Sequence, residues 1–195
     1  MKNPTHVWPC FQDSWSPTIG DPSLVGWFTV AAYALTAFLT ARLAFGKGGR
    51  PERVFWLMLF VLLAFLTVNK QLDLQSALTA LARCMAKVQG WYESRRGVQT
   101  GFILSLLGAS AVFLLILAVT MWRHLRRTWM AVLGLVFLTG FVAIRAVGFH
   151  RFDVLIKSDV AGVRVNWLLE LGGIALILAN VVALLFISRQ NAEAE

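Results

Sequence analysis

The sequence predicts an all-α membrane protein, a polytopic bundle of about five transmembrane helices with an additional amphipathic helix in the membrane interface. Of the 195 residues, 58% are hydrophobic and 14% are charged, and the mean hydropathy is +0.68. A soluble domain carries roughly 25% charged residues, so this chain has too little charge for a water-facing surface. A transmembrane helix takes about 20 residues, which leaves room for about five spans.

The apolar segments define the expected domain organisation. We expect a polar tail at residues 1–23, one transmembrane domain at residues 24–188 and a second polar tail at residues 189–195. Short basic connections separate the spans and are expected at the lipid headgroups. The spans are expected at about residues 24–45, 54–72, 100–122, 129–149 and 166–188.

Two of these spans have short apolar cores, at residues 54–68 and 129–144. At about 1.5 Å per residue, the first of these runs covers roughly 22 Å, whereas the hydrocarbon core is roughly 30 Å thick. We therefore expect both helices to draw the polar residues that follow them toward the membrane.

The interfacial helix is expected at about residues 74–90, between the second and third spans. Its apolar residues recur at helical spacing opposite Arg83 and Lys87, which is typical of a helix lying on a membrane surface. The apolar residues are Leu74, Leu78, Leu81, Met85 and Val88.

Small residues inside the spans are expected at helix contacts, because they let two helices approach closely. These residues are Gly108, Ala109, Gly134, Gly140, Gly172 and Gly173.

Polar residues are expected to gather at one membrane boundary. The second and fourth spans end on the face from which the fifth begins, so their polar ends share one layer. An ionisable group at membrane depth costs about 2.5 to 3.5 kcal/mol unless it finds a partner or water. The candidate binding residues are Asn69, Lys70, Asp73, Arg145, His150, Asp153, Arg164, Asn166 and Glu170.

This polar cluster has two interpretations. In the favoured one, ion pairs fix the packing of the helices, with Arg145 against Glu170 and Lys70 or Arg164 against Asp73 or Asp153. In the other, the cluster is a pocket open to one side that binds a polar lipid headgroup or a small anion.

The cluster also contains the candidates for catalysis. His150 is its one side chain that titrates near neutral pH, and Asp153 or Asp73 could orient it as a general base. No nucleophile motif accompanies these residues, and no compact ligand spacing supports a metal or a haem. We therefore expect no cofactor, and favour a protein that is not an enzyme.

Membrane lipids are the expected partners, together with a second copy of the chain or other membrane proteins. The net charge of +8 does not indicate nucleic acid, because the basic residues lie in connections between spans, where they meet headgroups. These basic residues are divided almost evenly between the two faces. With Lys70, Arg145 and Arg164 set aside as internal partners, we favour a cytoplasmic C-terminus. Cys10 and Cys84 would then lie in an oxidising compartment and could pair, whereas the opposite orientation would keep them reduced.

Four strings resemble those of uncharacterised bacterial multi-pass inner-membrane proteins: NKQLDLQ (69–75), GWYESRR (90–96), FHRFD (149–153) and NWLLELGG (166–173). The resemblance covers most of the chain and implies a bacterial inner membrane location, but no activity, cofactor or partner.

The leading hypothesis for function is a non-catalytic assembly or accessory component whose polar cluster fixes packing or binds a lipid headgroup. Two alternatives are an embedded enzyme acting on a lipid or isoprenoid at His150, Asp153 and Asp73, and a small oligomeric transporter built around Glu170 and Arg145.

Overall fold

The computed structural model describes residues 6–17, 19–46, 49–147, 159–160 and 163–193, and it is a helical bundle. The expected all-α class is confirmed. One antiparallel pair of two-residue strands, β1 and β2, immediately precedes the last helix. The helices are α1 (Val7–Ser14), α2 (Leu24–Ala44), α3 (Arg50–Leu72), α4 (Leu74–Val88), α5 (Arg95–Met121), α6 (Leu125–Val147) and α8 (Val165–Glu193). The shorter elements are η1 (Tyr92–Ser94), η2 (Trp122–His124), β1 (Asp159–Val160) and β2 (Val163–Arg164).

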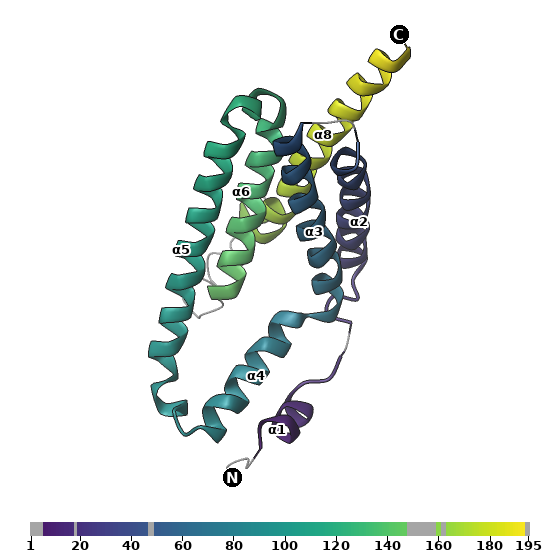
Figure 1. Cartoon of the computed structure of the whole chain (residues 1–195). Coiled ribbons are helices and arrows are strands. Elements are labelled where there is room, and N and C mark those ends of the chain that lie inside the picture. The colour runs from purple at the N-terminus through teal and green to yellow at the C-terminus, as the bar shows by residue number, and fades with distance from the viewer. Residues whose placement is uncertain (1–5, 18, 47–48, 148–158, 161–162, 194–195) are drawn as a thin grey trace.

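Among the described residues, four segments are long and apolar enough to cross a membrane. Three of them correspond to α2, α3 and α8, and the fourth is Thr100–Ala143. This fourth segment is a hairpin, because η2 joins α5 to α6 and the two helices lie side by side (Figure 1). The protein is therefore an integral membrane protein by the length and composition of its helices.

The core lies where α6 packs along α8 and α2 packs along α3, with α2 also touching α8. Leu63, Leu138 and Ile177 contribute fully buried side chains. The face of α2 in this core is rich in threonine, and the hydroxyls of Thr36 and Thr40 donate to the backbone carbonyls of Ala32 and Thr36. Bonding within the helix lets these hydroxyls lie in an apolar core without an orphaned donor.

Two glycines set the close contact between α6 and α8. A Cβ added at Gly134 would lie 2.6 Å from the carbonyl oxygen of Gly173, and one added at Gly173 would lie 2.9 Å from that of Gly134. The two backbones can approach this closely because neither residue has a side chain. Gly108 and Gly140, also expected at contacts, would meet nothing within 4 Å in the part of the chain that the structure describes.

A buried asparagine fixes the same pair of helices. Asn180 of α8 is 5% exposed; its Oδ1 accepts from the backbone N–H of Ala131 at 3.2 Å, and its Nδ2 donates to the carbonyl of Arg127 at 2.8 Å. Both partners are backbone atoms of α6, so the amide sets the register of α8 against α6.

The basic connections at one end of the bundle are also linked. Glu52, in the first turn of α3, accepts from His124 Nδ1 at 2.7 Å and lies 3.7 Å from Arg127 Nη1. The α2–α3 connection, η2 and the C-terminal part of α8 share this end, whereas α1 and α4 lie at the other (Figure 1). One carboxylate therefore joins the two hairpins.

A sharp turn separates α3 from α4. Asp73 has a φ of 45° and a ψ of 50°, the left-handed region, and Ser76 donates its hydroxyl to the Asp73 carboxylate. The turn sends α4 away from the end of α3 toward the start of α5 (Figure 1). Helix α4 covers most of residues 74–90, where the sequence predicted a helix.

We expect Asp73→Val to lower the unfolding free energy by about 1–2 kcal/mol, because a β-branched residue is disfavoured in the left-handed region and provides no acceptor for Ser76. Asp73→Asn is the matched control, because asparagine tolerates this region and keeps an oxygen. Thermal unfolding in detergent measures both variants, and equal losses would contradict the backbone explanation.

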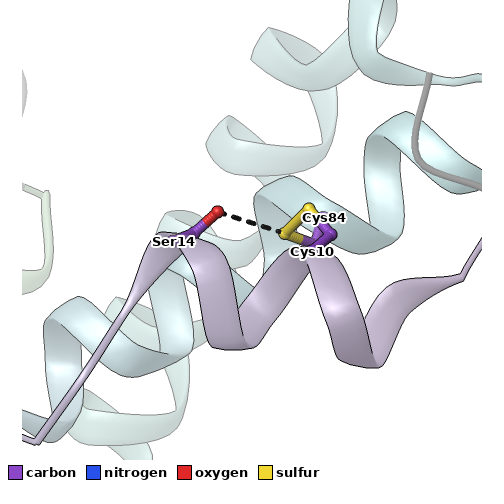
Figure 2. Close-up of a disulfide and its surroundings, with 3 residues drawn as sticks. All are labelled: Cys10, Ser14 and Cys84. Carbon is purple, nitrogen blue, oxygen red and sulfur yellow. Dashed lines mark hydrogen bonds between the residues drawn. A yellow bond between two sulfur atoms is a disulfide. The ribbon is translucent and has the colours of Figure 1, made fainter. Parts of the chain in front are cut away.

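The tail at residues 1–23 contains α1, which the sequence analysis did not expect. Cys10 of α1 and Cys84 of α4 form a disulfide with Cα atoms 5.8 Å apart. The hydroxyl of Ser14 lies 3.7 Å from the Cys84 sulfur (Figure 2). Pairing of the two cysteines, which the sequence left open, is thus present, and it holds α1 against α4.

Candidate functional site

The candidate site lies where α2, α3 and α8 meet, and its centre is an ion pair. Lys70 Nζ is 2.9 Å from Glu170 Oε2 and 3.2 Å from Oε1. The hydroxyl of Tyr33 donates to Glu170 Oε1 at 3.3 Å. The side chains of Lys70 and Glu170 are 11% and 2% exposed. The carboxylate is therefore buried, and both of its oxygens are hydrogen-bonded.

Helix geometry favours the lysine at its position. Lys70 lies in the last turn of α3, where the negative end of the helix dipole favours a cation, whereas Glu170 lies beyond the first turn of α8, outside the reach of the positive end. The polar end of α3 continues as helix to Leu72, beyond its apolar run, and this extension carries Lys70 to the level of Glu170.

A small cavity adjoins the pair. It has a volume of about 30 Å³ and is lined by Tyr33, Leu66, Asn69, Lys70, Phe141, Val142 and Glu170. Since roughly 10–15 Å³ of such space holds one water molecule, the cavity has room for about two. Its polar groups can hydrogen-bond such waters, and the space between the described side chains is small for a phospholipid headgroup.

Three of the expected binding residues meet at this cavity: Asn69, Lys70 and Glu170. The sequence favoured Arg145 as the partner of Glu170. The structure pairs this carboxylate with Lys70, and the side chain of Arg145 lies outside the described part of the chain. Lys70 reaches it because α3 packs against α2, which in turn contacts α8.

Asp73, a candidate for both catalysis and binding, is not among the residues that line the cavity. It forms the turn between α3 and α4, where its carboxylate accepts from Ser76. Its structural role explains why it does not extend the helical face of Asn69, four residues earlier: the backbone leaves the helix at Asp73.

For the remaining candidates, the structure describes no side chain. His150 and Asp153 lie outside the described residues. Arg145 belongs to α6, Arg164 to β2 and Asn166 to α8, and only the backbone of these three is described.

The sequence analysis missed two polar residues that matter for the site and its support, Tyr33 and Asn180. Tyr33 is 1% exposed and lies on the threonine face of α2. The available signal was its spacing: Thr29, Tyr33, Thr36 and Thr40 recur at helical intervals in an apolar run. Asn180 was an isolated amide in an uncharged span, which is a signal for a helix contact.

The described residues contain no group of three or more His, Cys, Asp or Glu side chains that could hold a metal ion. None of the described residues that line the cavity is Ser, Thr or Cys. The cavity contains the Lys70–Glu170 ion pair, whose two charges balance, together with the polar side chains of Tyr33 and Asn69.

Comparison of the chain with protein-family models, curated proteins and solved structures finds no match. The site must therefore be interpreted from its own geometry.

Proposed function

We propose that this chain is a non-catalytic assembly or accessory component of a bacterial inner membrane, and that its polar cluster fixes helix packing. The observation that carries the proposal is the Lys70–Glu170 pair, in which a carboxylate that is 2% exposed has both oxygens bonded within the protein. Its three hydrogen bonds, two to Oε1 and one to Oε2, hold the carboxylate between α2, α3 and α8 without a ligand.

The size of the cavity supports packing over headgroup binding. A space of about 30 Å³ holds about two water molecules and is small for a phospholipid headgroup. The pair instead joins α3 to α8, while Tyr33 adds α2, so three helices depend on one carboxylate. Such an arrangement stabilises a bundle that other membrane proteins could contact.

We expect Lys70→Met to lower the unfolding free energy by about 2–3 kcal/mol, because it leaves a buried carboxylate with Tyr33 as its donor. Glu170→Leu should cost less, since the unpaired lysine lies at the boundary and can extend toward the headgroups. The double variant Lys70→Met/Glu170→Leu should return to within about 1 kcal/mol of the wild type. Thermal unfolding in nanodiscs measures all three.

Lys87→Met is the matched control for loss of a lysine charge, because Lys87 lies on the exposed side of α4; it should change stability by less than about 0.5 kcal/mol. Native mass spectrometry of the double variant provides the second measurement. If the wild type retains a bound phospholipid that the folded double variant loses, the packing proposal is wrong and the headgroup hypothesis is right.

The proposal includes an orientation, with the C-terminus in the cytoplasm. The Cys10–Cys84 disulfide supports it, because disulfides persist in the periplasm and are rare in the cytosol. The basic residues do not add to this argument, because they are divided almost evenly between the two faces. The disulfide puts α1 and α4 outside.

Reporter fusions test the orientation. Alkaline phosphatase fused after Glu195 should be inactive and green fluorescent protein at the same position should fluoresce. A fusion after Gly90 should give the reverse pattern. Active phosphatase at the C-terminus would overturn the orientation and leave the packing proposal untouched, because the ion pair does not depend on which side it faces.

A further inference from the structure

We infer that α1 and α4 form a single disulfide-linked unit that binds the surface of the lipid bilayer, with the exposed side chains of Trp8, Leu78 and Met85 inserted at the level of the headgroups. The position of α4 is the first argument. It begins at Leu74, directly after the turn that ends the membrane-spanning helix α3, and it leads through η1 into α5. A helix tied at both ends to membrane-spanning helices must lie close to the boundary.

Helix α4 exposes apolar side chains on one of its faces. Leu78 and Met85 are 56% and 38% exposed, although their type is usually found inside proteins. Both lie on the apolar face of the helix, at a spacing of seven residues, whereas Arg83 and Lys87 lie on another face. Within the described part of the chain, α4 packs mainly against α1, so α6 and α8 do not cover this face.

The second helix of the unit presents aromatic rings. The ring centroids of Trp8 and Phe11 are 5.7 Å apart, and those of Phe11 and Trp15 are 5.6 Å apart. Their spacing of three and four residues puts these rings on one face of α1, roughly a third of a turn from the face of Cys10 and Ser14. That second face meets Cys84 (Figure 2), so docking on α4 leaves Trp8 exposed, while Phe11 and Trp15 are half-buried.

Lipid fits this combined surface better than protein does. Tryptophan is enriched at the headgroup level, because its ring is apolar and its N–H is polar. Trp8 is 63% exposed, and the unit is continuous with α3, so the ring has a bilayer beside it. We take the leaflet to be the periplasmic one, which rests on the proposed orientation. The contact with lipid does not depend on that orientation.

Fluorescence quenching in lipid vesicles tests the inference. The emission of Trp8 is obtained as the difference between the wild type and Trp8→Phe, a conservative variant whose disulfide can be checked on a non-reducing gel. Lipids brominated near the headgroups should quench this emission at least twofold more than aqueous iodide does. Trp122→Phe and Trp56→Phe are controls: Trp122 is 74% exposed at the other end, and Trp56 is 3% exposed in the core.

The possible outcomes distinguish lipid, water and protein as the environment of Trp8. Quenching by iodide alone would mean that α1 lies in water, and resistance to both quenchers would mean that a second copy or another protein covers Trp8; either result overturns the inference. Cys10→Ala/Cys84→Ala should shift Trp8 from lipid quenching toward iodide quenching. Unchanged lipid quenching in that variant would overturn the disulfide-linked unit. None of these readings depends on the ion pair or on which way the protein faces.

Discussion

Replacing Gly134 with leucine is expected to abolish the folded bundle, as seen by the loss of the monodisperse peak in size-exclusion chromatography. A Cβ at this position would lie 2.6 Å from the carbonyl oxygen of Gly173 and 2.8 Å from Ile177 Cγ1. The first of these atoms belongs to a helix backbone and cannot rotate away, so α6 and α8 would have to separate. Overpacking by a single methyl group already costs about 1–3 kcal/mol, which is the expected loss for Gly134→Ala.

Gly140→Leu is the matched control, because Gly140 lies in the same helix and a Cβ there would meet nothing within 4 Å among the described residues. It removes the same flexible residue and adds the same apolar side chain. A comparable loss of folded protein in both leucine variants would mean that the effect comes from helix propensity and not from the α6–α8 contact.

Asn180→Asp is expected to lower the unfolding free energy by about 3–5 kcal/mol, the cost of an uncompensated buried charge. Asn180 is 5% exposed and lies near the middle of the segment Trp167–Gln190. The amide nitrogen that now donates to the Arg127 carbonyl at 2.8 Å would become an oxygen, so two acceptors would face each other. Ion pairing cannot relieve this easily, because the backbone of α6 occupies the contact.

Asn180→Ala separates the charge from the lost hydrogen bonds. It removes both bonds to α6 without adding a charge, and it should cost about 1–2 kcal/mol. Thermal unfolding in nanodiscs compares the two variants. Equal losses would contradict the electrostatic explanation, and no loss in either would contradict the contact between Asn180 and α6.

The sequence predicted the helical class, because that class depends on local composition. The length of an apolar run sets where a helix can cross a membrane. The amphipathic spacing of residues 74–90 predicted the helix that is now α4. Helix α1 was not predicted, because its aromatic face is short and the helix contains Pro9. Pairing of Cys10 with Cys84 was left open, because it depended on an orientation that the even division of basic residues did not settle.

The site was predicted at the level of a layer and not of a contact. The rule that polar helix ends share a depth brought Asn69, Lys70 and Glu170 to one candidate list, and the structure places all three at one cavity. Depth alone does not say which helices are neighbours, so Arg145 was preferred over Lys70 as the partner of Glu170. Tyr33 was missed because a tyrosine in an apolar run resembles an ordinary core residue until its partner is known.

The disulfide between α1 and α4 also constrains how the chain matures. Cys84 follows Cys10 by 74 residues, so the bond cannot close before α2, α3 and most of α4 have left the ribosome. At about 5–20 residues per second, the first thiol waits on the order of ten seconds for its partner. In the proposed orientation this thiol faces the periplasm during that interval, so oxidising enzymes there would meet a half-inserted chain, and the bond would form only after the first hairpin had been inserted.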